Sequence, residues 1–249
     1  MKINILNKIK EQYPTIKLDE VETFQDKYKE RFYYSVESKI EGRDFARNSL
    51  MFLVGTLQRS YSLFKGAINS LNNSDVISSY LASRAHMEST GSIAYFLIKL
   101  RKYYEKDISM EEIEYCLMQL YLGKKYYAEN EDNPLEIQPI NVLTLIDAVD
   151  KVFFKSTTNK GHRRIFRDTY EWISEFCHPN HFGQILGVKK DGRKAIFDYH
   201  HFPGIHEVQH FYFSLNSSCH LMIPMYDECL SLIEQHERLP ELVKYKNDS

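Results

Sequence analysis

Two long amphipathic helical segments, separated by a short break, constrain this sequence more than any other feature. Residues 45–71 carry apolar side chains three to four positions apart, a spacing that places them on one face of an α-helix. Asn72 and Asn73 end this segment, and Asp75 is suited to cap the helix that follows, up to about residue 105. Helices of this length are stable when their apolar faces pack together, so the pair predicts a helical bundle.

Helical periodicity extends over most of the remaining chain. Asp44 is the expected cap of the first long helix. Ser109 and Glu112 have the spacing of a capping box, in which each side chain bonds the backbone N–H of the other residue, and they predict the start of a third helix. Further helical patterns cover residues 19–40, 138–155, 161–177 and 205–235, with Pro224 inside the last of them as a candidate kink.

One stretch departs from this pattern. Between Gly183 and Gly204, two short apolar runs flank the string Lys-Lys-Asp-Gly-Arg, and Asp-Gly between such runs is a strong signal for a β-hairpin turn. We therefore expect an all-α fold, a helical bundle of six or seven helices with a small β-hairpin insertion around 184–202. The expected single domain covers 1–249, with an N-terminal helical segment (1–40), a helical core (45–235) and a disordered tail (240–249).

Composition excludes several classes of protein. The formal net charge of -2 provides no overall basic field for nucleic acid, although a basic patch on one face stays open. None of the four cysteines forms a Cys-Xaa-Xaa-Cys pair, so neither a zinc knuckle nor a disulfide framework is expected. The chain has no apolar run of a signal peptide and no predominantly apolar run of the roughly 18 residues that span a bilayer. We expect a cytoplasmic protein with no membrane partner.

The string HEVQH, which starts at His206, has the spacing of a zinc metallopeptidase helix. On a helix, His206 and His210 share one face, and Glu207 is placed to act as a general base on a zinc-bound water. A catalytic zinc needs a third protein ligand, for which Glu228 is a candidate, and a Pro-Gly pair ending at Gly204 would put the string in the first turn of its helix. Two interpretations stay open, a zinc-dependent hydrolase and a polar helix start.

Arg84 and Glu88 are the only charged residues between Asp75 and Lys99. A charged side chain is costly on a packed apolar face unless it has a partner. Their spacing of four lets the two side chains meet on one face of a helix. The pair is therefore either a structural ion pair or part of a cleft that binds a further group.

A second polar cluster lies in the string EWISEFCHPN. Helical spacing puts Glu171, Glu175 and His178 on one side of the helix. Pro179 excludes His178 from the helical region, so its imidazole lies at a helix C-terminus, where the helix dipole and a nearby glutamate favour the protonated ring. Such a histidine is a candidate general acid or base. Alternatively, the His-Pro-Asn string only caps the helix end.

Basic residues gather in two segments around this cluster. A positive face of this kind suits a phosphate-bearing ligand or RNA, and surface charge in contact with solvent is the alternative. The first segment holds Lys160, His162, Arg163, Arg164 and Arg167, and the second holds Lys189, Lys190, Arg193 and Lys194.

The pattern Arg84-Xaa-Xaa-Xaa-Glu88 and the later pattern Glu175-Xaa-Xaa-His178-Pro-Asn resemble those of a bacterial family of all-helical proteins. This family is similar to the HEPN domains (higher eukaryotes and prokaryotes nucleotide-binding), and the resemblance covers residues 45–235. It implies a helical bundle that forms a homodimer. Many HEPN proteins are metal-independent ribonucleases of toxin–antitoxin and phage-defence systems, so it also implies an antitoxin or defence partner.

The chain departs from the active HEPN ribonucleases in one respect. Those enzymes carry an Arg followed by a polar residue and then a His, with four to six residues between the Arg and the His. The only match here runs from Arg193 to His200, in the predicted hairpin, so we do not transfer the HEPN catalytic pair to it.

We expect instead that Arg84, Glu88, Glu175 and His178 converge between two helices. In this arrangement His178 exchanges a proton, Arg84 holds a phosphate, and the glutamates orient both. The leading prediction is a HEPN-like protein that acts on RNA or a nucleotide, as a metal-independent ribonuclease with no cofactor and no metal. The alternatives are a non-catalytic binding or dimerisation module and the zinc-dependent hydrolase.

Overall fold

The computed structural model describes residues 3–37, 45–122, 137–153, 164–198, 202–237 and 241–244. Seven helices of 12 or more residues lie in these ranges, which confirms the predicted all-α fold class. They are α2 (Leu18–Lys29), α3 (Phe45–Asn72), α4 (Val76–Tyr104), α5 (Met110–Leu122), α6 (Val142–Phe153), α7 (Ile165–Cys177) and α9 (Ile205–His236). Two short helices, α1 (Asn7–Gln12) and α8 (His181–Gln184), complete the set in the described ranges.

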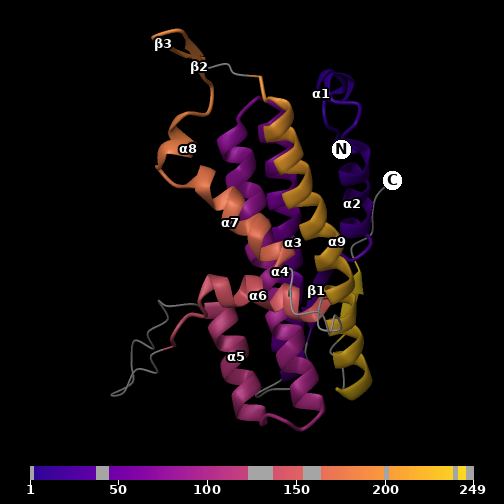
Figure 1. Cartoon of the computed structure of the whole chain (residues 1–249). Helices are drawn as coiled ribbons and strands as arrows, with labels where there is room; N and C mark the ends of the chain where they lie inside the picture. The colour runs from indigo at the N-terminus through magenta and orange to yellow at the C-terminus, as the bar shows by residue number, and fades with distance from the viewer. Residues whose placement is uncertain are drawn as a thin grey trace, which may run out of the picture.

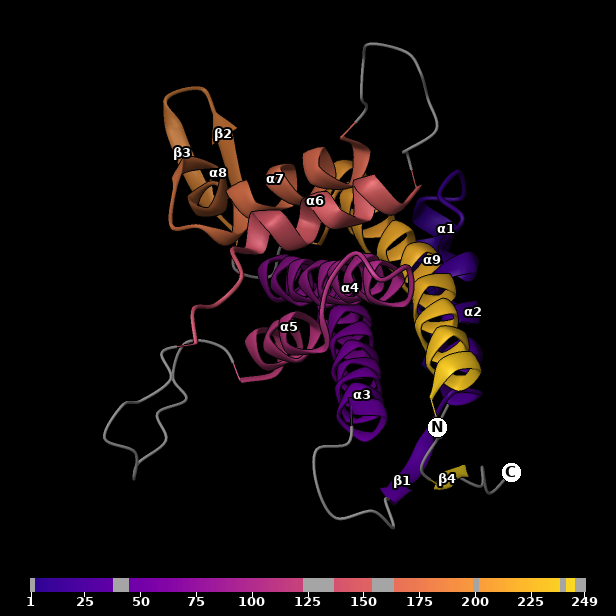
Figure 2. The same ribbon diagram turned by 90° about the horizontal axis from the view of Figure 1, so that it is seen from below.

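Helix α4 is the centre of the bundle. The helices α3, α4 and α9 run side by side (Figure 1), and the view along the bundle shows α3, α5, α6 and α9 arranged around α4 (Figure 2). Helix α7 packs on α4 and α6, and α2 covers the outer side of α9. A helix surrounded in this way needs apolar or small side chains on nearly all its faces, which explains why α4 carries so few charges. None of the helices in the described part of the chain combines the length and apolar character that crossing a bilayer requires.

Gly91 allows a close crossing of α4 and α6. A Cβ atom at Gly91 would lie 2.8 Å from the backbone carbonyl carbon and oxygen of Leu145 in α6. Real Cβ atoms do not approach backbone so closely, so only glycine lets α6 lie against α4 at this point. This crossing brings α6, and α7 after it, to the part of α4 that carries Arg84 and Glu88.

The predicted helix caps agree with the structure where they are described. The Asp75 carboxylate accepts a hydrogen bond from the Ser78 backbone N–H at 3.0 Å. The capping box of α5 also forms: the Ser109 N–H donates to Glu112 Oε2 at 2.8 Å, and the Glu112 N–H donates to Ser109 Oγ at 3.2 Å. The predicted cap at Asp44 lies outside the described residues.

The β-hairpin is confirmed. Strands β2 (Val188–Asp191) and β3 (Lys194–Phe197) pair antiparallel and project from the end of the bundle (Figure 1). Gly192 in the turn has φ 58°, a left-handed conformation that glycine adopts without a steric penalty.

Two predictions at the chain ends are wrong. The helix predicted for 19–40 ends at Lys29, and the segment after it forms β1 (Tyr33–Glu37), so 1–40 is not wholly helical. Residues 241–244 of the predicted disordered tail form β4 (Glu241–Lys244), which pairs antiparallel with β1. Tyrosine and valine favour strands when a partner strand is present, and here that partner comes from the far end of the sequence.

Three other helices differ from the predicted ranges only in their limits. Helix α6 starts at Val142, because the Asn141 side chain accepts a hydrogen bond from the Leu143 N–H at 2.8 Å and so caps the helix. Helix α7 starts at Ile165 and ends at the predicted residue. Helix α9 continues through Pro224 to His236.

Candidate functional site

Arg84 and Glu88 meet on α4, and Tyr170 of α7 joins them. Arg84 Nε lies 3.3 Å from Glu88 Oε1 and donates to Tyr170 Oη at 3.2 Å. Tyr170 Oη in turn donates to Glu88 Oε1 at 2.9 Å. The two charged side chains are 23% and 30% exposed, so this ion pair lies at the edge of the core and reaches solvent. The three residues form a closed hydrogen-bonded triangle between α4 and α7.

The protonation of this triangle follows from its surroundings. Burial alone would lower the pKa of Arg84, but the hydrogen bond to Tyr170 and the charge of Glu88 raise it above its ordinary value. For Tyr170, burial raises the pKa of the hydroxyl, and the hydrogen bond from Arg84 partly opposes this increase. Arg84 is therefore cationic and Tyr170 is a neutral hydroxyl at neutral pH. Arg84 holds the Glu88 carboxylate by an ion pair, and Tyr170 holds it by donating a hydrogen bond.

Glu88 also lines a hollow on the opposite side of α4 from the bundle's α9. The hollow has a volume of about 300 Å³ and lies where α3, α4, α5 and α6 meet. On its wall, Arg59 of α3 donates from Nε to Ser89 Oγ at 3.3 Å. Among the described residues, no carboxylate pairs with Arg59. We call this space the Glu88 hollow; its walls are formed by Phe52, Thr56, Arg59, Glu88, Ser89, Ser92, Leu120, Val142 and Leu145.

The Glu88 hollow combines a cation, an anion and hydroxyl groups. Ser92 Oγ donates to the Glu88 backbone oxygen at 3.1 Å and Ser89 Oγ donates to the Ala85 oxygen at 3.1 Å, so both hydroxyl protons are used within α4. Among the described residues, the donors that remain for a ligand are those of Arg59 and the Thr56 hydroxyl, and the main acceptor is the Glu88 carboxylate. Such a set suits a polar ligand that carries both an anionic group and hydrogen-bond donors.

Glu175 and His178, the other two predicted site residues, lie outside the Arg84–Glu88–Tyr170 triangle. Both side chains are exposed. Glu175 Oε2 accepts from Asn180 Nδ2 at 2.8 Å. Among the described residues, no hydrogen bond or ion pair joins either of them to Arg84 or Glu88. The predicted convergence of all four residues in one network is therefore wrong.

The helical spacing of α7 explains this separation. Tyr170 and Ile173 are buried against α4, and Cys177 is half-buried one turn further on the same face. Glu175 projects from another face of the helix. His178 has φ −89° and ψ 151°, so it has left the helix as Pro179 predicts, and its side chain points to solvent. Tyr170 was not predicted as a site residue. It lies three positions before Ile173 and seven before Cys177, and this helical spacing was the signal that it faces α4 as they do.

The HEVQH string starts in the first turn of α9, as its Pro-Gly context predicted. Helix α9 begins at Ile205 after Gly204, so the two histidines occupy the first two turns. His206 is exposed, whereas the His210 ring stacks on the Trp172 ring of α7 with a centroid distance of 3.1 Å.

Among the residues that the structure describes, the zinc interpretation finds no third ligand. Glu228 receives two hydrogen bonds from Arg101, each 2.7 Å, and so is already occupied. Within the described ranges, no group of three His, Cys, Asp or Glu side chains is placed to hold a metal ion. His200 and His201 lie outside those ranges.

The first basic segment does not present a free positive face where it is described. Arg167 donates to Asp147 Oδ1 at 3.0 Å and to Glu171 Oε1 at 2.5 Å. Arg164 lies 3.8 Å and 3.6 Å from the same two carboxylates. The prediction of a basic patch is wrong for these two arginines, because acidic residues of α6 and α7 neutralise them. Arg193 and Lys194 are exposed on the hairpin, and the side chains of Lys160, His162, Arg163, Lys189 and Lys190 lie outside the described residues.

Comparisons of the chain with protein-family models, with curated proteins and with solved structures find no match. The HEPN-like assignment therefore stays a prediction from the two sequence patterns.

Proposed function

We propose that the protein acts on RNA or a nucleotide, and that the ligand binds in the Glu88 hollow. The observation that carries this proposal is the pairing of an ordered carboxylate with a guanidinium on the walls of one small hollow. A nucleotide offers a phosphate to Arg59, and its ribose hydroxyls or base amino groups can donate to Glu88. A volume of about 300 Å³ is at the lower end for small-molecule sites, so the ligand is one nucleotide, either free or part of a single-stranded RNA.

Within this proposal, Arg84 and Tyr170 are positioning residues. They fix the Glu88 carboxylate by an ion pair and a hydrogen bond, so that it need not be reoriented when a ligand donates to it. Among the described residues, no contact supports the expected role of His178 in proton exchange. The geometry therefore favours binding of the ligand over its cleavage. Ribonuclease activity in toxin–antitoxin or phage defence is a more specific form of the same proposal.

Expression in bacteria tests the proposal. Cells that express the wild-type protein should grow slowly and contain degraded or protein-bound RNA, and Glu88→Gln should restore growth and free the RNA. Glu175→Gln, at an exposed glutamate outside the triangle, is the matched control and should behave as wild type. His178→Ala reports separately on proton exchange. Equal growth and intact, unbound RNA for wild type and Glu88→Gln would overturn the proposal.

A non-catalytic binding or dimerisation module is the second candidate, because aromatic side chains are exposed on one face of the molecule. Trp172, Phe182 and Phe213 are 36%, 49% and 58% exposed on α7, α8 and α9. Large exposed apolar side chains that lie together often mark an interface. Sedimentation equilibrium tests this candidate: a dimer that Phe213→Ser converts to a monomer supports it, and a wild-type monomer contradicts homodimerisation.

A further inference from the structure

The hairpin of β2 and β3 exposes side chains that the fold does not use. It projects from the end of the bundle (Figure 1), and all four residues of β3 (Lys194–Phe197) are exposed. Among them, Ile196 is 47% exposed and Phe197 is 63% exposed. A lone two-stranded hairpin is only marginally stable in water, and apolar side chains left in solvent do not strengthen it. These two residues therefore indicate a surface that binds a partner.

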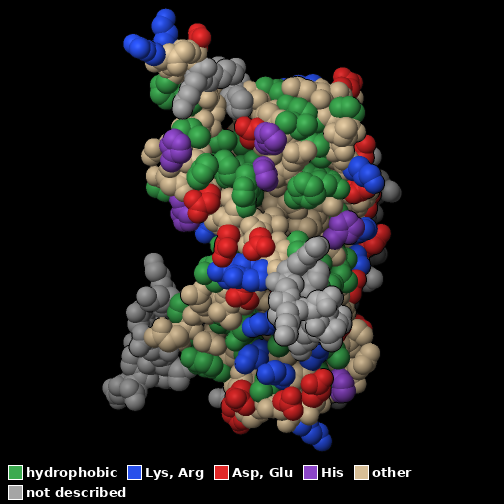
Figure 3. Space-filling model, viewed as in Figure 1, with side chains coloured by type: hydrophobic (Ala, Val, Ile, Leu, Met, Phe, Trp, Pro, Cys, Tyr) green, Lys and Arg blue, Asp and Glu red, His purple; other side chains and the backbone are tan. Residues whose placement is uncertain are grey.

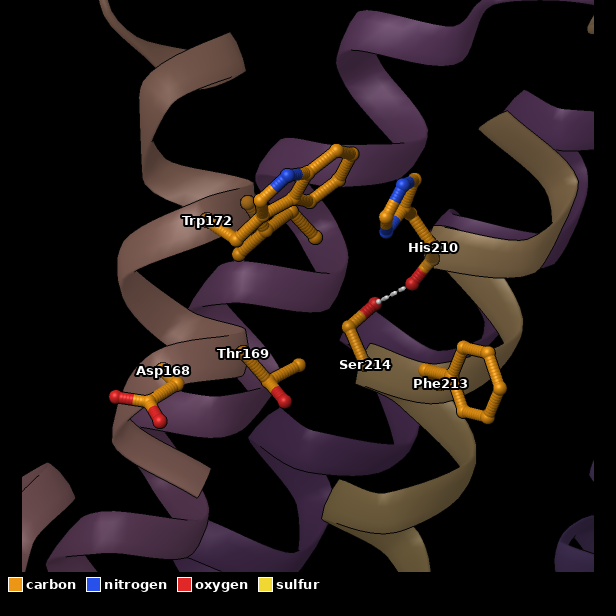
Figure 4. Close-up of a pocket in the computed structure, with 7 residues that line it drawn as sticks. Asp168, Thr169, Trp172, His210, Phe213 and Ser214 are labelled. Atoms are coloured by element: carbon orange, nitrogen blue, oxygen red, sulfur yellow. Dashed lines mark hydrogen bonds between the residues drawn. The ribbon is translucent and has the colours of Figure 1, made fainter. Parts of the chain in front are cut away.

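The Phe197 ring differs from the Trp172 ring, which is also partly exposed. In the hollow between α7 and α9, the His210 ring stacks on Trp172 with a centroid distance of 3.1 Å, so a ligand finds that ring covered (Figure 4). In the described part of the chain, no ring or cation–π contact involves Phe197. Its neighbours on the same side of the hairpin are the small Ala195 and, across the ladder, Val188. Phe197 is thus an aromatic surface that a ligand can reach.

Positive charge is concentrated in the same hairpin. From Val188 to Phe197 the sequence holds four basic residues and one acidic residue, a formal charge of +3, whereas the whole chain has -2. Arg193 and Lys194 are exposed beside the turn, and no ion pair within the described residues neutralises them. Lys and Arg side chains stand at the outer end of the hairpin, with hydrophobic side chains behind them (Figure 3). The hairpin therefore offers cations at its tip and an aromatic ring further back along β3.

We propose that the β2–β3 hairpin binds single-stranded nucleic acid, with Phe197 stacked on an unpaired base and Arg193 and Lys194 on the phosphates. Proteins bind single strands in this way, because the strand alternates flat bases with anionic phosphates. A duplex suits the hairpin less, since its bases are stacked on one another and offer no face to Phe197. Entry into a membrane is not favoured either, because the charged tip would have to enter before the apolar residues.

The spacing of these contacts calls for an oligonucleotide. Phe197 lies four positions after Arg193, which corresponds to about 13 Å along a strand at about 3.3 Å per residue. A chain of a few nucleotides engages both residues, whereas the Glu88 hollow takes one nucleotide. The hairpin thus extends the proposed function to a second contact with RNA, and the assignment does not depend on the Glu88 hollow.

Fluorescence anisotropy of a labelled oligouridine of roughly ten nucleotides tests the proposal on the full-length protein. Saturable binding is expected, and a labelled duplex of the same length should bind at least about fivefold more weakly, since it offers no base to stack. An oligothymidine that binds at least about tenfold more weakly identifies RNA as the ligand, and comparable binding identifies any single strand. Absence of saturable binding, or equal affinity for the duplex, would overturn the proposal. So would displacement of oligouridine by polyglutamate or by phosphatidylserine-containing vesicles as effective as that by unlabelled oligouridine.

Variants then locate the contacts. Phe197→Ala should weaken oligouridine binding at least about fivefold, the loss of one stacked base. Arg193→Gln combined with Lys194→Gln should reduce the slope of log affinity against log salt by about 1.4, because each phosphate contact on a single strand contributes about 0.7. Phe213→Ala, at a ring that is 58% exposed on α9, and Lys17→Gln are the matched controls and should bind as wild type. Wild-type affinity in Phe197→Ala that circular dichroism shows to be folded, or an unchanged salt slope in the double variant, would contradict the assignment.

Binding of adenosine monophosphate separates this inference from the proposed function. Phe197→Ala should bind the mononucleotide within about twofold of wild type, because the hairpin does not line the Glu88 hollow. The effect of Phe197→Ala on oligouridine binding should be the same in a Glu88→Gln background, as is expected of sites that share no contacts. Failure of the mononucleotide to bind contradicts only the Glu88 hollow, and failure of the Phe197→Ala effect contradicts only the hairpin.

Discussion

We predict that acidification destabilises the protein through one side chain, His86. Its imidazole is fully buried between α2, α4 and α9. Its Nε2 lies 2.5 Å from Tyr28 Oη, and its Nδ1 lies 2.7 Å from Ser218 Oγ, so both ring nitrogens have partners. Burial lowers the pKa of His86 from 6.5 to about 3. The folded protein thus keeps a neutral ring at pH values where the unfolded chain is protonated.

The sign and size of the effect follow from this difference in pKa. Below pH 6.5 the unfolded state binds one more proton than the folded state, so the free energy of unfolding decreases as the pH falls. The slope approaches about 1.4 kcal/mol per pH unit and persists down to about pH 3, where the folded state also takes up the proton. Between pH 7 and pH 5, the loss due to His86 amounts to about 2 kcal/mol.

Urea unfolding at the two pH values measures this loss. His86→Gln removes the titrating group, so it should lose about 2 kcal/mol less than wild type on going from pH 7 to pH 5. Tyr28→Phe keeps the histidine and leaves its Nε2 only the weaker contact with Cys219 Sγ at 3.7 Å. It should be less stable than wild type by about 1–3 kcal/mol at both pH values and retain the wild-type pH dependence. An equal pH dependence in wild type and His86→Gln would refute the reasoning.

Two further predictions concern helix packing and capping. Gly91→Ala should lower the free energy of unfolding by about 1–3 kcal/mol, because the new Cβ would meet the Leu145 backbone. Gly55→Ala places its Cβ in open space and should raise the free energy of unfolding by about 0.5–1 kcal/mol. Thermal unfolding of the two variants compares these effects. Asp150→Ala should cost about 1 kcal/mol, because the Asp150 carboxylate accepts from two backbone N–H groups at the start of α7, each at 3.1 Å; an unchanged unfolding temperature would contradict this capping role.

The fold was predictable wherever the determining signal is local. The long helices, the caps at Asp75 and Ser109 and the Asp-Gly turn all depend on residues within a few positions of one another. The sheet of β1 and β4 depends on a pairing between Val36 and Leu242, near opposite ends of the chain. Local periodicity carries no information about such a partner, which is why a helix and a disordered tail were predicted instead.

The candidate site was predictable only in part, for a related reason. Arg84 and Glu88 stand out because they are the lone charges in an apolar helix, and their spacing makes them meet. Tyr170 and Arg59 belong to other helices, so their place beside Glu88 is decided by how α3, α4 and α7 pack. His178 lies at the C-terminal end of α7, as predicted. Its side chain, however, lies on a face of the helix end that points to solvent.

Direct binding of a nucleotide in the Glu88 hollow is the most decisive test of the proposed function. Calorimetric titration of the purified protein with adenosine monophosphate and with a short single-stranded RNA should show saturable binding. Arg59→Gln and Glu88→Gln should each weaken it about tenfold or more, the expected loss of a charge-assisted hydrogen bond. Lys17→Gln, at an exposed lysine just before α2, is the control and should leave the affinity within about twofold of wild type. Absence of binding in wild type, or equal affinities in wild type, Arg59→Gln and Glu88→Gln, would contradict the assignment of this hollow as the nucleotide site.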